Sequence, residues 1–351
     1  MPISAIAVIT AAAVAGAALS SPEALLEAGH FKRVQKLAEE RLKTRPDART
    51  YYYLSRVRLA YGDFDGAMAL AEKAVALDGR SADAHYALAA ASGRKAQQAG
   101  LFSRFGLARR FRKEAEAAIA LDPGHLAARD GLIEFHLQAP GIVGGDKARA
   151  RSLADEILRI DPCRGYLAKA RIARSDKQAA EAEALLNKAV QADPASYEAH
   201  TTLAAFEAAD AQKKYDLAER HAREAARLEP DRATAFGLLA ALAVLRGRAD
   251  TLDALLAEAE AHVPDSLSPY YQAGRVLLER GQDPARAERC FRKYLTQEPE
   301  GNTPTAAHAH WRLAQALERQ GRTAEARSEL QAAVRLKPDL EPAKKDLARL
   351  R

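Results

Sequence analysis

Hydrophobic residues recur along this chain at helical spacing, and the pattern returns at a nearly constant interval. Each round ends at a proline, or once at a glycine, and several of these prolines follow an acidic residue. The nine marks are Pro46, Gly79, Pro123, Pro162, Pro194, Pro230, Pro264, Pro299 and Pro338. Because proline cannot continue a helix and glycine readily caps one, we expect a helix to end at each mark.

Two positions upstream of each mark are apolar in every round. The residue eight positions upstream is Ala38, Ala71, Ala115, Ala154, Leu186, Ala222, Leu256, Phe291 or Leu330. The residue twelve positions upstream is Val34, Ala67, Phe111, Ala150, Ala182, Ala218, Leu252, Ala287 or Ala326. Residues four apart lie on the same face of a helix. The sequence therefore predicts a helix before each mark that buries one face, lined mostly by small residues.

A second helix is predicted upstream of most of these helices. Its inner face is marked by two adjacent residues, most of them a leucine followed by a small residue. These are Leu54-Ser55, Leu88-Ala89, Leu132-Ile133, Leu203-Ala204, Leu239-Ala240, Ala273-Gly274 and Leu313-Ala314. Turn glycines follow at Gly62, Gly247, Gly281 and Gly321. We expect Ser55 to face Ala67, and Ala314 to face Ala326, because small residues let two helices approach closely.

This pattern of helix pairs closely resembles the tetratricopeptide repeat, whose period is about 34 residues. The resemblance covers roughly residues 22–351. It implies an all-α fold, namely a right-handed superhelical solenoid of antiparallel helix hairpins. We expect about eight to nine repeats over residues 21–340, with a short first helix near 21–28. Residues 341–351 are expected to form a C-terminal capping helix.

Three insertions interrupt the period, near residues 94–110, 139–146 and 300–304. The first is expected to form two longer helices broken near Gly100. It is rich in basic residues: Arg104, Arg109, Arg110, Arg112 and Lys113. The second contains the sequence PGIVGG at 140–145, which resembles a loop in a subset of bacterial exported tetratricopeptide-repeat proteins. Its glycines precede a predicted helix without a phosphate-binding signature, so we interpret them as a turn.

Composition favours a folded, soluble, helical protein, with 48% hydrophobic and 28% charged residues. The formal charge of +6 is spread over the chain. It lacks the dense basic stripe of a nucleic-acid binder, so no nucleic-acid partner is expected. The two cysteines, Cys163 and Cys290, have no metal-ligand spacing and lie in separate repeats, so we expect two thiols without a bridge.

The first twenty residues contain no charged side chain, and residues 5–19 are apolar. The small-residue pattern before Ser21 is typical of a secretory signal peptide at 1–20, cleaved after Ser20. A periplasmic or secreted location follows. The stretch lacks a basic start, which keeps two alternatives open: a retained inner-membrane anchor and a buried first helix. A membrane contact is expected only if this segment is retained.

No catalytic constellation is visible. The chain has no HExxH zinc motif, no GxSxG nucleophile elbow and no cysteine–histidine zinc spacing. His308 and His310 are two residues apart and so point to different helix faces. We therefore expect no enzyme activity, no cofactor and no metal site.

The first helix of each pair is expected to line the concave surface of the solenoid. Its candidate partner-binding residues are Arg49, Tyr52, Arg56, Tyr86, Arg164, Arg171, Arg174, Tyr271, Arg275 and Trp311. Tyrosine, tryptophan and arginine dominate interface energetics, and the arginines suit an acidic segment. The alternative is that these arginines pair with neighbouring carboxylates and only keep the groove soluble.

The sequence thus predicts a non-catalytic scaffold that binds a protein or peptide segment in the concave groove, in the periplasm. Two other functions remain open at this point. One is a membrane-anchored assembly factor of the cell envelope. The other is a cytoplasmic regulator that binds a short peptide.

Overall fold

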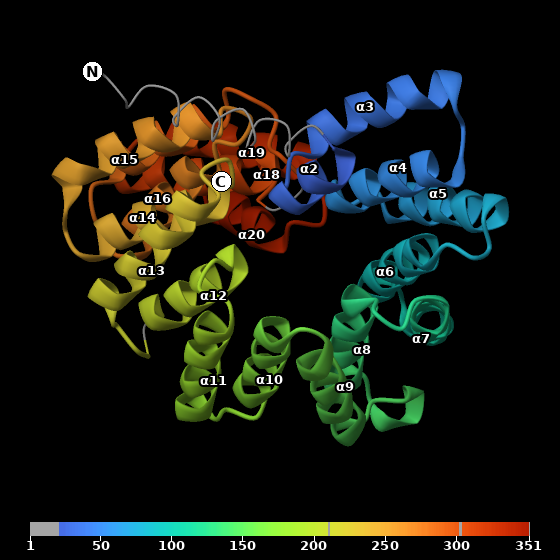
Figure 1. Cartoon of the computed structure of the whole chain (residues 1–351). Helices are drawn as coiled ribbons and strands as arrows, with labels where there is room; N and C mark the ends of the chain where they lie inside the picture. The colour runs from blue at the N-terminus through green and yellow to red at the C-terminus, as the bar shows by residue number, and fades with distance from the viewer. Residues whose placement is uncertain (1–20, 210, 302–303, 351) are drawn as a thin grey trace, which may run out of the picture. The chain divides into compact units, whose positions relative to one another are not determined.

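The computed structural model describes residues 21–350 except residue 210 and residues 302–303. The predicted signal segment at 1–20 lies outside the described residues. The described chain consists of α-helices and one 3-10 turn, without a strand, which confirms the all-α prediction (Figure 1). The helices are α2 (Pro22–Ala28), α3 (Phe31–Thr44), α4 (Ala48–Ala60), α5 (Phe64–Leu77), α6 (Ala82–Gln98), α7 (Leu101–Leu121), α8 (Leu126–Gln138), η1 (Gly141–Val143), α9 (Lys147–Ile160), α10 (Pro162–Ser175), α11 (Ala179–Ala192), α12 (Tyr197–Ala208), α13 (Tyr215–Leu228), α14 (Ala233–Leu245), α15 (Ala249–His262), α16 (Ser268–Glu279), α17 (Pro284–Tyr294), α18 (Ala306–Arg319), α19 (Thr323–Leu336) and α20 (Glu341–Arg349).

The marks found in the sequence do terminate helices. In eight of the nine cases the helix ends two residues before the mark, as α3 does at Thr44 before Pro46. The exception is α17, which ends at Tyr294, five residues before Pro299. The next helix often starts with a polar cap. Asp47, for example, accepts a hydrogen bond from the backbone N–H of Thr50 at 2.9 Å, which satisfies a donor that the first turn leaves open.

The apolar positions upstream of the marks form the core. All nine residues at the eight-residue offset and all nine at the twelve-residue offset are at most 8% exposed. The predicted close approach of Ser55 and Ala67 is confirmed, because the Ser55 hydroxyl donates to the Ala67 carbonyl oxygen at 2.8 Å. The partner of a large residue is correspondingly small: a Cβ on Gly274 would lie 2.9 Å from the ring of Phe291.

The turn between the two helices of a pair requires a left-handed residue. The four predicted turn glycines all have positive φ, between 67° and 78°. Lys177 and Lys213 occupy the corresponding turns of other pairs with φ of 61° and 50°. A side chain in this region costs of the order of 1 kcal/mol, so glycine is favoured but not obligatory there.

The chain divides into two compact units, residues 1–182 and 183–351, and the division falls within α11. In the first unit α4 contacts α6, α6 contacts α8 and α8 contacts α10. In the second unit α12 contacts α14, α14 contacts α16 and α16 contacts α18. First helices of neighbouring pairs therefore lie against one another in each unit, which places their outward residues on one shared surface.

The insertions enlarge connections without adding a new layer. Helices α6 and α7 are 17 and 21 residues long and are separated at Ala99 and Gly100. The PGIVGG stretch forms the 3-10 turn η1 between α8 and α9. The third insertion, between α17 and α18, is only partly described. At the C-terminus, α20 packs on α19, and its Ala343 is fully buried.

Candidate binding surface

Helices α4 and α6 bring the aromatic candidates of the first unit together. Tyr52 and Arg56 are one turn apart on α4, and an Arg56 Nη1–H donates to the Tyr52 hydroxyl at 3.2 Å. On α6, Tyr86 packs edge-on against the His125 ring with centroids 5.2 Å apart. Burial raises the pKa values of Tyr52 and Tyr86, so both phenols stay neutral over the physiological range.

Tyr86 on α6 lies near charged side chains of three other first helices. Its pKa responds, after burial, to the charges of Arg56 on α4, Asp130 on α8 and Arg171 on α10. The Arg171 Nη1–H donates to Asp130 at 3.1 Å, which joins α10 to α8. The outward sides of α4, α6, α8 and α10, called the first-helix surface below, therefore carry aromatic and charged groups in one connected row.

Most candidate arginines on this surface have acidic or phenolic neighbours. Arg49 forms an ion pair with Glu23 and donates to the Tyr53 hydroxyl at 2.7 Å. Arg164 lies 3.9 Å from Asp161, a contact at the limit of an ion pair. Arg174 is exposed and makes no side-chain hydrogen bond or ion pair with any described residue. The alternative in which arginines pair with neighbouring carboxylates thus describes several of them, but neither Arg174 nor Arg56, which contacts only a phenol.

The three candidate residues of the second unit, Tyr271, Arg275 and Trp311, lie in different surroundings. Tyr271 is only 6% exposed and packs against the rings of Phe291 and Tyr294, so its prediction as an exposed groove residue is wrong. The reason is that α17 carries large aromatic residues where most repeats carry alanine. Arg275 on α16 is partly exposed, and its guanidinium pairs with the Glu279 carboxylate at 2.7 Å.

Trp311 is engaged by the capping helix. Its indole Nε1–H donates to Asp346 of α20 at 2.8 Å, and the Arg312 guanidinium lies 4.5 Å from the ring centroid. A hollow of about 560 Å³ lies beside it, between α16, α18 and α20. It is lined by Leu278, Glu279, Arg312, Gln315, Glu318, Arg319, Asp346 and Arg349. Its opposite charges pair with one another, as Arg349 does with Glu318.

The sequence interpretation missed the acidic half of these surfaces. Asp83 on α6 lies 3.4 Å from the His125 imidazole, whose hydrogen bond lowers the pKa of this carboxyl. Asp130 and Glu279 pair with candidate arginines in the same way. The pair of Arg275 with Glu279 was visible in the sequence as an i,i+4 spacing within α16. The contacts of Asp83 and Asp130 join different helices, so spacing along one helix does not reveal them.

Nothing in the described residues points to chemistry at a metal or nucleophile. No group of three or more histidine, cysteine, aspartate or glutamate side chains is placed to hold a metal ion there. Neither Cys163 nor Cys290 forms a disulfide, and both are buried. Burial raises the pKa of the Cys290 thiol to about 11, which keeps it protonated and unreactive. Within residues 21–350, apart from the gaps, no helix has the length and apolar character to cross a membrane.

Comparison with known proteins decides the repeat type. Models of the tetratricopeptide repeat match residues 164–196 and residues 271–341. The chain contains tetratricopeptide repeats. Among curated proteins, none matches the chain. The repeats matched at 164–196 comprise α10 and α11, and those at 271–341 run from α16 to the start of α20.

Solved structures share this tetratricopeptide-repeat architecture. The crystal structure of yeast Tom70 is similar with a TM-score of 0.50 and 15% sequence identity, covering 96% of this chain and 88% of that chain. A monomeric mutant of IFIT1 with Gppp-AAAA has a TM-score of 0.51 and 16% identity, covering 91% of this chain and 76% of that chain. At such identity the likeness establishes the fold alone. Tetratricopeptide-repeat proteins are generally non-catalytic scaffolds, and the fold supports a protein-interaction role.

Proposed function

We propose that this protein is a non-catalytic scaffold whose first-helix surface binds an extended protein or peptide segment. The observation that carries the proposal is the convergence of Tyr52 and Arg56 on α4 with Tyr86 on α6 and Arg171 on α10, three of the first helices of the first unit. Aromatic side chains supply rigid contact area, and guanidinium groups add directed donors. A segment lying along these helices would meet such groups on α4, α6 and α10, so its affinity would be distributed over several contacts.

The partner is proposed to carry carboxylates at intervals. Arg174 makes no ion pair with a described carboxylate and Arg56 contacts only the Tyr52 phenol, whereas Arg171 and Arg49 already have acidic neighbours. An acidic partner would bind Arg174 directly and would compete with Asp130 and Glu23 for the paired arginines. Competition of this kind costs little at exposed sites, where an ion pair is worth about 0–1 kcal/mol.

The proposed location is the periplasm, on the strength of the apolar segment at 1–20. A membrane-anchored form of the same scaffold and a cytoplasmic form remain the alternatives. N-terminal sequencing of the protein from fractionated cells separates the three. A mature chain that starts at Ser21 supports export, whereas an intact Met1 in membranes or in the cytoplasm supports one of the others.

The binding proposal is tested by crosslinking in cells followed by mass spectrometry, with variants of matched charge. Arg171→Glu combined with Arg174→Glu should reduce partner capture by about tenfold, because two favourable contacts become repulsive. Arg159→Glu combined with Lys36→Glu is the control, since both residues are exposed on second helices, α9 and α3. Helicity should be unchanged in both. Equal capture by the double variant and the control would remove the first-helix surface from consideration.

A further inference from the structure

A concavity of about 740 Å³ lies between α7 and the turn η1, away from the residues of the first-helix surface. It is called the α7 concavity here. It is lined by Arg109, Arg110, Arg112, Lys113, Glu114, Gly141, Ile142, Val143 and Gly144. Helix α7 is the second helix of its pair, so this feature is separate from the surface proposed above.

One wall of the concavity is held in a fixed shape. The Pro140 carbonyl oxygen accepts hydrogen bonds from the N–H groups of Val143 at 2.9 Å and Gly145 at 3.2 Å. The His136 Nδ1 atom lies 2.9 Å from the Gly144 carbonyl oxygen, which ties the turn to α8. A Cβ on Gly145 would lie 1.7 Å from the Ala139 carbonyl oxygen, so the chain passes itself too closely for any side chain there. A wall that needs no rearrangement lowers the entropic cost of binding.

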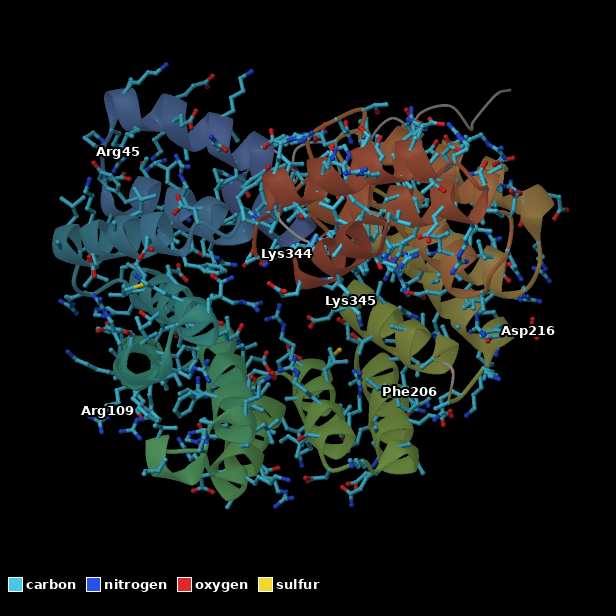
Figure 2. All side chains as sticks on the ribbon, turned by 180° about the vertical axis from the view of Figure 1, so that it is seen from behind. Arg45, Arg109, Phe206, Asp216, Lys344 and Lys345 are labelled. Carbon is cyan, nitrogen blue, oxygen red and sulfur yellow. The ribbon has the colours of Figure 1, made fainter. Side chains whose placement is uncertain are left out.

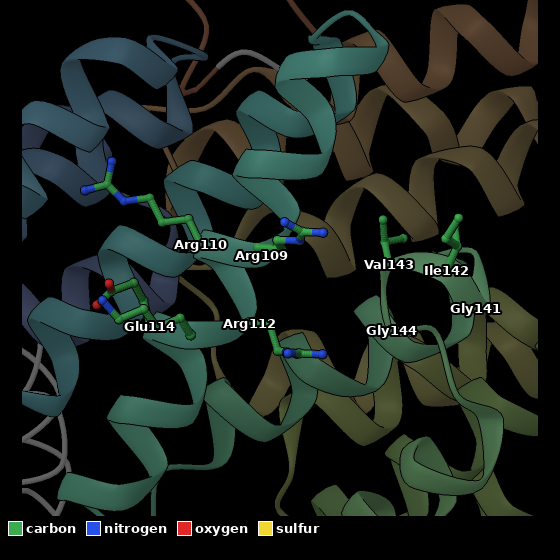
Figure 3. A pocket seen from close by; sticks show the side chains of 9 residues that line it. Arg109, Arg110, Arg112, Glu114, Gly141, Ile142, Val143 and Gly144 are labelled. Carbon is green, nitrogen blue, oxygen red and sulfur yellow. The ribbon is translucent and has the colours of Figure 1, made fainter.

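The other wall is a face of α7 whose charged side chains point in two different directions. Figure 3 shows Arg109 and Arg112 pointing toward the turn, while Arg110 and Glu114 point away from it. The latter two are engaged elsewhere, Arg110 with Glu72 at 2.6 Å and Glu114 with His85 at 2.7 Å. The carboxylate that lines the concavity is therefore turned from it.

The cations that remain are available to a ligand. Arg109 extends from α7 into solvent (Figure 2), and neither Arg109 nor Lys113 forms a side-chain hydrogen bond or ion pair with a described residue. Arg112 has only a distant contact, with Glu116 at 3.6 Å. A Cβ on Gly144 would lie 2.7 Å from the Arg112 guanidinium, which shows how closely that group approaches the turn.

An apolar side chain stands at the rim. Ile142 is 87% exposed, more than any other large hydrophobic residue among those described. Exposure of so large an apolar side chain to water is unfavourable relative to burial. The hollow thus combines an exposed isoleucine, which can contact an apolar group, with the unpaired Arg109 and the loosely paired Arg112, which can bind an anionic group.

We propose that the α7 concavity is a second binding site, which takes a short acidic peptide segment with an aliphatic residue next to its carboxylates. The carboxylates would accept hydrogen bonds from Arg109 and Arg112, with Lys113 adding charge, and the aliphatic side chain would cover Ile142. The hollow shape favours a segment of chain over a bilayer, which would present a flat array of headgroups.

The test uses the purified full chain and fluorescence anisotropy with a labelled peptide of alternating glutamate and leucine. A matched peptide of glutamine and leucine removes the charge. Arg109→Glu with Lys113→Glu should weaken binding of the acidic peptide by about tenfold, and Ile142→Ser by about threefold. A photoreactive leucine analogue in the peptide should crosslink to α7 or to residues 141–144, which separates this site from the first-helix surface.

Four results would overturn the proposal. The first is crosslinking confined to α4, α6, α8 or α10. The second is peptide binding that the α7 variants leave unchanged. The third is an Ile142→Ser variant that binds as the parent does, since charge alone would then account for the site. The fourth is binding of vesicles of phosphatidylglycerol and phosphatidylcholine that depends on Arg109 and Lys113 while peptide binding does not. Arg159→Glu combined with Lys36→Glu serves again as the charge-matched control.

Discussion

The first-helix surface and the α7 concavity both present arginine side chains, but the carboxylates around these arginines are placed differently. On the first-helix surface Arg171 meets Asp130 at 3.1 Å, a partner contributed by the neighbouring first helix. Around α7, Glu72 of α5 pairs with Arg110 and Glu114 pairs with His85, while Glu116 only approaches Arg112 at 3.6 Å and Arg109 is left to solvent. The number of cations in a segment therefore says little about what the segment can bind. The directions of the carboxylates on adjacent helices decide it.

The strongest way to sharpen this comparison is to remove the carboxylate of a buried pair. Arg129 on α8 is 6% exposed, and its Nε–H donates to Glu156 on α9 at 3.2 Å. Glu156→Ala should lower the free energy of unfolding by about 3 kcal/mol, because an arginine is then buried without its countercharge. Urea denaturation followed by circular dichroism measures this.

Glu116→Ala is the matched control, since Glu116 is an exposed residue 3.6 Å from Arg112 on α7. Its removal should change the free energy of unfolding by less than about 0.5 kcal/mol. If the two variants were destabilised equally, the contrast between buried pairs and the loosely held cations of α7 would be mistaken.

Glu207 in the second unit contrasts with the unpaired cations of α7, because its carboxyl group is buried and not exposed. Glu207 on α12 is 2% exposed, and its Oε2 atom has no hydrogen-bond partner among the described residues. Burial, followed by the charge of Glu183, raises its pKa to about 7 from 4.5. The folded protein then binds this proton more tightly than the unfolded chain does, so stability falls as pH rises from about 4.5 to about 7.

Glu207→Gln should remove that loss. Relative to the parent, the variant should gain about 2 kcal/mol in the free energy of unfolding at pH 8 and little at pH 4. Denaturant titrations of both proteins across this range give the difference curve, which cancels the other carboxylates. A flat difference curve would show that Glu207 titrates normally.

The smallest expected effect concerns the partly exposed pair Arg171–Asp130. A double-mutant cycle of Arg171→Ala and Asp130→Ala should give a coupling energy of about 0.5 kcal/mol. The coupling should shrink in 1 M salt, where the Debye length is about 3 Å. A coupling above about 2 kcal/mol would mean that this arginine is locked to its neighbour and unavailable to an acidic partner.

The sequence predicts the repeated core well and the surfaces incompletely. Positions such as Ala71 and Leu256 could be assigned to the core because each contributes to a helical period that recurs along the chain. Tyr271 could not be placed, since its burial depends on Phe291 and Tyr294 from the following helix. The pairing of Arg171 with Asp130 joins residues 41 positions apart, and no local pattern encodes it.

The α7 concavity also could not be predicted from local sequence patterns. The sequence indicates a basic helix and a glycine turn as two separate features, and taken singly each is best explained as a solvated face and a connection. The packing of α7 near η1 makes one hollow of them. The fact that Arg110 and Glu114 turn away from this hollow depends on Glu72 and His85, which belong to earlier helices.

The alanines that recur in the core have a geometric consequence. Ala67, Ala71, Ala150 and Ala154 are fully buried, and each occupies the contact between adjacent helices. A methyl group is the smallest side chain that still excludes water, so these residues set the distance between neighbouring hairpins. Adding one or two carbons at such a place would push the hairpins apart and shift every later contact in that unit by the same increment. The pitch at which successive repeats present their side chains is thus set by residues that no ligand can touch.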